Sequence, residues 1–285
     1  MPHQPEDLGC VRVYISWVRL GSTPVIENSE PNFRSEAEIQ TETLPENPDR
    51  RSWRLAKLSP AEWTAVWLSL RIATAATIAS LPFGILVAYA LARWRFAGKM
   101  ILNAAVHLPL VMPPVVTGFL LLILFGRKGV FGGFLANIGI VLSFRWTGAA
   151  VACAVMGFPL MVRAMRLSFE SIDQRLEQAA GTLGANRMWT FFLVSLPLAL
   201  PGIIAGSILA FARALGEFGA TITFVANIPG ETQTIASAIY SYTQVPGGDA
   251  NALRLTVVSI AISFAALVAS EIVQRRAGKA LANLV

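Results

Sequence analysis

Two ionisable residues, Arg213 and Glu217, interrupt a stretch of the chain that is otherwise apolar. They are four residues apart, so on a helix their side chains share one face and can form an ion pair. Ionisable groups at membrane depth are costly and are usually paired or functional. Two interpretations follow: an ion pair that fixes packing, or an arginine that gives positive potential to a path for an anion, with Glu217 preventing permanent capture.

Residues that could build another reactive centre are scarce. The two histidines, His3 and His107, and the two cysteines, Cys10 and Cys153, have no spacing typical of a metal site or a disulfide. His107 is expected to hydrogen-bond a neighbouring helix. No Gly-x-x-x-x-Gly-Lys-Ser/Thr phosphate loop occurs, so any ATP would be bound by a partner. We therefore expect a chain that is not an enzyme and binds no cofactor or metal itself.

The elements that must position these residues are apolar helices. Of 285 residues, 54% are hydrophobic and 14% charged, and the mean hydropathy is +0.57, which excludes a disordered chain and a typical cytosolic enzyme. Five charge-free runs approach or exceed the roughly 20 residues that cross a bilayer as a helix. We predict an all-α polytopic membrane protein with five transmembrane helices, near 64–92, 102–126, 146–166, 191–225 and 253–274.

The basic residues between these spans predict the orientation. Ten Lys and Arg lie on one side, after the first and fifth spans and between the third and fourth, and four lie on the other. The positive-inside rule places the ten-charge side in the cytoplasm, with the C-terminus inside and the N-terminus outside. The glycine-rich segment 129–144 is then an external re-entrant or surface segment.

The first residues differ from the rest. Residues 1–60 carry seven basic and nine acidic residues, a net −2, against +8 for the remainder. Residues 1–57 are rich in Pro and Glu and contain no apolar run long enough for a span or a signal peptide. We expect a disordered extension, or upstream sequence wrongly joined to a shorter protein that begins near residues 58–63; a regulatory tail is the alternative.

Prolines and small residues indicate how the spans are shaped. Prolines should kink the second and fourth spans because each removes a backbone donor. Gly202 and Gly206, four residues apart, are typical of close helix contacts. The prolines concerned are Pro109, Pro113, Pro114, Pro197 and Pro201.

The loop from 172 to 189, between the third and fourth spans, predicts two short helices. Gly184 permits a sharp turn, and a second helix begins at about Asn186. Small residues on an exposed helix let a partner approach closely; the alternative is an amphipathic helix on the bilayer surface. The apolar stripe of the first helix comprises Ile172, Leu176, Ala179, Ala180 and Leu183.

The same loop resembles a known family. Ala179 and Ala180, then Gly184, then Val194-Ser195-Leu196-Pro197 resemble the EAA loop of binding-protein-dependent ABC importer permeases, with Gln178 in the place of the usual Glu and Glu177 one residue earlier. The strings HLPLVMPPVVTG at 107–118, FARALGEFGAT at 211–221 and NIPGETQT at 227–234 resemble the molybdate permeases of that family.

The resemblance implies a fold, partners and sites. It implies the ABC transmembrane type-1 fold over 58–279, in a multi-pass protein of the bacterial inner membrane that imports molybdate by alternating access. The implied partners are a second copy of the chain, two cytoplasmic ATPase subunits that use ATP and Mg, an external molybdate-binding protein and membrane lipid, with no nucleic acid. The loop 172–189 would couple to the ATPase through Glu177, Gln178, Ala179, Ala180, Leu183 and Gly184.

Other functions fit parts of the same pattern. A permease for tungstate, sulfate or thiosulfate shares every physical feature above, and only the family strings favour molybdate. A passive channel or a membrane scaffold is a different class, and neither requires the small-residue cytoplasmic loop. A membrane-embedded enzyme would need clustered histidines, cysteines or paired carboxylates in the spans, which the sequence lacks.

Overall fold

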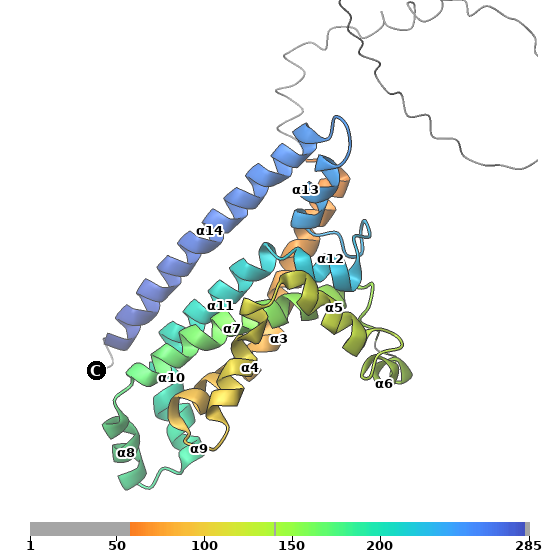
Figure 1. The fold of residues 1–285 in the computed structure, drawn as a ribbon. Coiled ribbons are helices and arrows are strands. Elements are labelled where there is room, and N and C mark those ends of the chain that lie inside the picture. The colour runs from red at the N-terminus through yellow and green to blue at the C-terminus, as the bar shows by residue number, and fades with distance from the viewer. Residues whose placement is uncertain (1–57, 140, 283–285) are drawn as a thin grey trace, which may run out of the picture. The chain divides into compact units, whose positions relative to one another are not determined.

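A computed structural model describes residues 58–139 and 141–282, without the side chains of residue 270 and of residues from 273 onward. The expected extension 1–57 lies outside the described residues. The described residues belong to one compact unit, Arg51–Val285. Every regular element within them is a helix, which confirms the predicted all-α class (Figure 1).

Three helices form the centre of the bundle: α3 (Pro60–Arg93), α7 (Trp146–Ser171) and α11 (Leu200–Leu215). Small side chains let them approach closely. A Cβ added at Gly202 would lie 2.1 Å from the Cβ of Ser168, and one at Gly206 would lie 2.8 Å from the carbonyl oxygen of Met161. Both glycines therefore face α7, which confirms the predicted close contact.

The start of α3 follows from its sequence. Ser59 and Glu62 form a capping box, in which each side chain accepts from the backbone amide of the other residue, and Pro60 occupies the first turn. Glu62 is also buried and accepts a hydrogen bond from Arg254 Nη2 at 3.0 Å. The pair joins the start of α3 to α14 (Asp249–Ala282).

Proline breaks the second predicted span. The helices α4 (Lys99–Val111) and α5 (Pro114–Phe125) meet at an angle of 114°. The break falls at Met112 and Pro113, because Pro113 and Pro114 supply no amide hydrogens to continue α4. His107 Nδ1 lies 2.8 Å from the carbonyl oxygen of Asn103 in its own helix. The expected bond to a neighbouring helix was therefore wrong.

A second bend divides the helix that follows the loop. From α9 (Arg187–Thr190) the chain passes through a π-helical turn, Phe191–Ser195, and through α10 (Leu196–Leu198) into α11, with a bend of 68°. Pro197 and Pro201 lie on either side of this bend. The predicted kinks are present in both spans.

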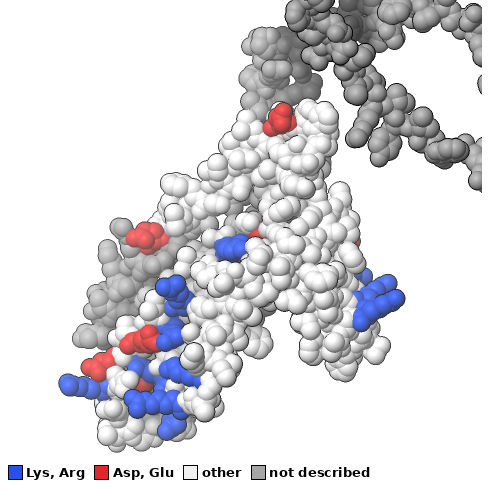
Figure 2. All heavy atoms as spheres, viewed as in Figure 1, with Lys and Arg blue, Asp and Glu red and all other residues white. Residues whose placement is uncertain are grey.

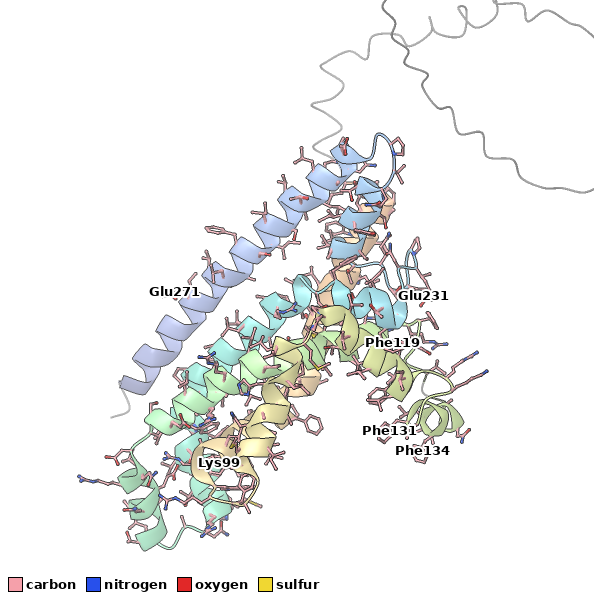
Figure 3. All side chains as sticks on the ribbon, in the orientation of Figure 1. Lys99, Phe119, Phe131, Phe134, Glu231 and Glu271 are labelled. Carbon is pink, nitrogen blue, oxygen red and sulfur yellow. The ribbon has the colours of Figure 1, made fainter. Side chains whose placement is uncertain are left out.

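Shorter helices lie at the end of the bundle opposite the loop that contains α8 (Gln174–Thr182) and α9 (Figure 1). They are α6 (Gly132–Asn137), α12 (Gly219–Val225) and α13 (Ile235–Thr243). Figure 3 shows Phe119 on α5, Phe131 just before α6 and Phe134 on α6. All three residues are more than half exposed.

The described helices have the dimensions of a membrane bundle. Helices α3 and α7 and the first part of α14 are each long and apolar enough to cross a membrane. If each of the two bent pairs counts as one span, the number is five. The part of α14 whose side chains are described, up to residue 272, carries exposed apolar side chains, including Val257, Ile260 and Phe264, as expected of a helix that faces lipid or another subunit.

Candidate functional site

The loop after α7 folds into the two expected short helices. Asp173 caps the start of α8 (Gln174–Thr182), where its carboxylate accepts a hydrogen bond from the backbone amide of Arg175. Asn186 caps the start of α9, where its side-chain oxygen accepts a hydrogen bond from the backbone amide of Trp189. Gly184 lies between them with φ of 90°, a left-handed conformation that favours glycine. The turn predicted at Gly184 is confirmed.

Helix α8 has two faces of different character. None of its residues is buried, and Leu183, just beyond its end, is 88% exposed. Helical spacing places Leu176, Ala179, Ala180 and Leu183 together on one side. Ile172 does not extend this exposed stripe as expected, because it is buried in the core of the bundle, in one cluster with Leu91 and Phe169. The stripe of four residues, called the apolar stripe below, is open to a partner.

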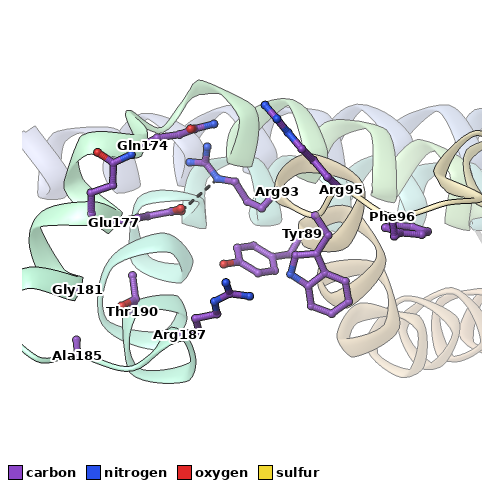
Figure 4. A pocket seen from close by; sticks show the side chains of 12 residues that line it. Tyr89, Arg93, Arg95, Phe96, Gln174, Glu177, Gly181, Ala185, Arg187 and Thr190 are labelled. Atoms are coloured by element: carbon purple, nitrogen blue, oxygen red, sulfur yellow. Dashed lines mark ion pairs between the residues drawn. The ribbon is translucent and has the colours of Figure 1, made fainter.

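The other face of α8 is tied to the chain itself. Glu177 Oε1 lies 3.1 Å from Arg93 Nε and accepts a hydrogen bond from Ser195 Oγ at 2.8 Å. Arg93 Nη2 donates to the carbonyl oxygen of Ile172 at 2.8 Å. Figure 4 shows this ion pair. Gln178, the next residue of α8, lines the same cavity as Glu177. Glu177 thus anchors the loop to the end of α3.

Basic side chains gather at this end of the bundle, around α8, α9 and the connection from α3 to α4 (Figure 2). A cavity of about 750 Å³ lies among them, lined by Arg93, Arg95 and Arg187 and by the single acid Glu177. Basic residues that predicted the cytoplasmic side from the sequence are therefore concentrated next to the loop.

The Arg213 and Glu217 side chains meet at the far end of α11. Arg213 Nη1 is 2.6 Å from Glu217 Oε2, and the other carboxylate oxygen accepts the Ala220 amide at 2.8 Å. The two residues were expected on one face of a continuous helix. Instead α11 ends at Leu215, and Glu217 lies in the break before α12. Glu217 therefore links the end of α11 to the first turn of α12.

Burial differs sharply between these two side chains. The Glu217 side chain is 1% exposed and that of Arg213 is 28% exposed. A buried carboxylate that loses its cation keeps the full cost of desolvation, whereas an arginine with access to water does not. The pair stabilises the junction of α11 and α12 mainly through compensation of the Glu217 charge.

Arg213→Gln should therefore destabilise the chain more than Glu217→Gln. We expect a cost of roughly 3 kcal/mol for the first change, since it leaves a buried charge uncompensated. The cost of the second should be about 1 kcal/mol, because a glutamine oxygen can still accept the Ala220 amide. Thermal unfolding of the purified chain in detergent measures the order. Equal midpoints, or a lower midpoint for Glu217→Gln, would contradict it.

Several interactions were not anticipated from the sequence. Arg93 and Glu177 are 84 positions apart, and nothing in either segment indicates the other. The guanidinium of Arg71 stacks 3.9 Å over the ring of Trp146. The Ser-x-x-Glu pattern at 59–62 is typical of a capping box and could have indicated the role of Glu62 at a helix start. Its pairing with Arg254 depends on the tertiary fold.

The described residues form a membrane-type bundle of apolar helices, two pairs of them bent at prolines, with a short exposed helix in the loop after α7. The family model for the inner membrane component of binding-protein-dependent transport systems matches residues 80–279. The chain belongs to this family of ABC transporter permeases.

Relatives and solved structures agree with this class. The chain is 56% identical to the molybdenum transport system permease protein ModB of Escherichia coli K12, over 78% of this chain and 99% of that protein. It is 51% identical to ModB of Haemophilus influenzae, over 77% of this chain and 96% of that protein. It is 35% identical to the sulfate transport system permease protein CysT of Salmonella typhimurium, over 73% of this chain and 81% of that protein.

The folds of solved transporters are similar as well. A bacterial alginate ABC transporter superposes with a TM-score of 0.63 at 16% identity, over 86% of this chain and 90% of that one. The methionine transporter MetNI, in an inward-facing conformation, superposes with a TM-score of 0.61 at 18% identity, over 78% of this chain and 99% of that one. At these identities the similarity establishes the fold, which confirms the predicted type-1 permease architecture.

Proposed function

We propose that this chain is the permease subunit of an ATP-driven importer that carries molybdate across the inner membrane by alternating access. The observation that carries the proposal is the 56% identity to a molybdenum permease across 99% of that relative's length. The sulfate permease at 35% identity supports sulfate as the second candidate. Tungstate, a tetrahedral oxyanion similar to molybdate, would be expected to use the same path.

The assembly we propose contains two copies of this chain, two cytoplasmic ATPase subunits and an external molybdate-binding protein. ATP and Mg are bound by the ATPase. A solved alginate transporter of similar fold is described in complex with a loaded periplasmic protein, which supports an external partner. The exposed apolar side of α14 is a surface on which lipid or the second copy could pack.

Coupling would pass through the loop of α8 and α9. The apolar stripe with Gly184 is the surface offered to the ATPase, and the anchor of Glu177 on Arg93 transmits movement of the loop to α3. Closure of the ATPases on ATP would then favour the outward-open packing of the spans, and hydrolysis would restore the other. Gln178 lies on the anchored face of α8 and would assist Glu177.

We further propose that the α8–α9 end lies in the cytoplasm and the α5–α6 connection outside. The excess of Lys and Arg around the loop supports this orientation. A membrane-impermeant thiol reagent applied to intact cells should label Lys128→Cys and spare Arg175→Cys, each made with Cys10→Ser so that the native cysteine does not react, since both positions are exposed but on opposite sides. The reverse pattern would contradict the orientation.

For Arg213 and Glu217 we propose a structural ion pair at the junction of α11 and α12. The salt bridge and the bond to the Ala220 amide support this role. An additional contribution of Arg213 to the oxyanion path would have to be weak, because a site that held molybdate tightly would not release it.

The proposed substrate is tested in vesicles that contain the chain, its ATPase and the external binding protein. Molybdate uptake should require internal ATP and should persist in a tenfold excess of sulfate. Uptake of sulfate with no uptake of molybdate would establish the second candidate instead. Uptake that needs neither ATP nor the binding protein would indicate a passive channel.

A further inference from the structure

The cavity beside the loop carries more positive charge than the chain compensates. Three arginines and one carboxylate line it, and that carboxylate, Glu177, is already paired with Arg93. Within the described part of the chain, neither Arg95 nor Arg187 has a carboxylate partner. Both residues line the cavity, and Figure 4 shows them on opposite sides of the ion pair of Arg93 and Glu177. The cavity is therefore suited to an anion that the chain does not supply.

The surface proposed for the ATPase is on the opposite side of α8. Gln174, Glu177, Gln178 and Gly181 line the cavity. At 100° per residue these four positions cluster on one face, and the apolar stripe lies about 180° around the helix from them. A protein bound to the stripe would leave the cavity face free. The cavity is thus a separate site rather than a part of the coupling surface.

The remaining lining residues indicate the kind of anion. Tyr89, Trp94 and Phe96 border the cavity, and Trp94 and Phe96 are exposed. Aromatic rings next to arginines at the end of a membrane-spanning helix are typical of the headgroup region of a bilayer. Basic pockets of this kind between transmembrane segments bind anionic lipid headgroups. A volume of about 750 Å³ also exceeds what one inorganic phosphate would fill.

We propose that this cavity binds the headgroup of an anionic phospholipid between Arg95 on one side and Arg187 on the other, with Arg93 held in place by Glu177. The headgroup would bridge the connection from α3 to α4 and the start of α9, which is the second helix of the coupling loop. A free phosphate offers the same chemistry, and the test separates the two sources. The proposal does not depend on the identity of the transported oxyanion.

The test uses the full chain in nanodiscs of phosphatidylcholine with a minor fraction of phosphatidylglycerol. Native mass spectrometry measures the phosphatidylglycerol retained after mild removal of bulk lipid. The double variant Arg95→Gln, Arg187→Gln should bind it about thirtyfold more weakly, since each basic residue near an anionic headgroup contributes about a factor of five. The matched control Arg175→Gln removes an exposed charge from the same loop, outside the cavity, and should retain lipid like the unmodified chain.

A second arm adds inorganic phosphate in millimolar excess. If the unmodified chain keeps its phosphatidylglycerol in the presence of phosphate, the cavity is a lipid site. If phosphate releases phosphatidylglycerol from the unmodified chain, the cavity accepts the phosphate group of a lipid and free phosphate alike. Equal retention by all three proteins would overturn the proposal, as would an equal loss in the Arg175→Gln control. If the double variant lost the ATPase but kept the lipid, the cavity would belong to the protein partner, and the proposal would fail.

Discussion

Leu183→Asp should abolish binding of the partner ATPase while the chain still folds in the membrane. The Leu183 side chain is 88% exposed and makes up one end of the apolar stripe. Aspartate there costs the isolated chain little, but in a closed interface it would bury a charge without a partner, a penalty of about 3 kcal/mol or more. Association should weaken by over a hundredfold. Co-purification of the ATPase with the tagged chain measures the loss.

The control for this change is Thr182→Asp. Thr182 is the adjacent exposed residue and lies off the apolar stripe, so the same charge at nearly the same place should leave the ATPase bound. Ala180→Asp, within the stripe, should behave like Leu183→Asp. Normal recovery of the ATPase with both stripe variants would reject the assignment of this surface to coupling.

Gly118→Ala should reduce transport severely and destabilise the chain. A Cβ at residue 118 would lie 2.5 Å from the carbonyl oxygen of Ala220 and 2.9 Å from its Cα. These are backbone atoms and cannot rotate away, so α5 and α12 must separate. Overpacking of this kind costs about 1–3 kcal/mol. The shift would also move the Ala220 amide away from Glu217, which accepts its hydrogen bond.

Gly133→Ala provides the comparison for Gly118→Ala. An added Cβ at Gly133 in α6 meets no atom within 4 Å, and alanine is the better helix former. This variant should match or slightly exceed the stability of the unmodified chain. Thermal unfolding and substrate uptake should separate the two variants, and indistinguishable results would contradict the close packing of α5 on α12.

The positions of the helices were readable from the sequence where a local rule decides them. Charge-free runs located the apolar helices, and prolines identified the bends, because a missing amide hydrogen acts within its own turn. The turn at Gly184 and the cap at Asn186 follow equally local rules. What local rules do not set is the angle of a bend, 114° in one case and 68° in the other.

The sites were readable only in part, for the same reason. The apolar stripe appears in the spacing of residues, but its boundary at Ile172 depends on α3, whose Arg93 reaches the Ile172 carbonyl. The salt bridge of Arg213 and Glu217 followed from a spacing of four residues, yet the helix break between them did not. Pairs such as Glu62 with Arg254 join residues 192 positions apart and require the tertiary fold.

The proposed coupling of a molybdate-loaded external protein to the partner ATPase is tested most directly by ATP hydrolysis in the reconstituted complex. Binding protein loaded with molybdate should raise the ATPase rate several-fold, and binding protein offered sulfate should not. The stimulation should disappear with Leu183→Asp and persist with Thr182→Asp. Stimulation by sulfate alone, or a rate that is independent of the binding protein, would contradict the account.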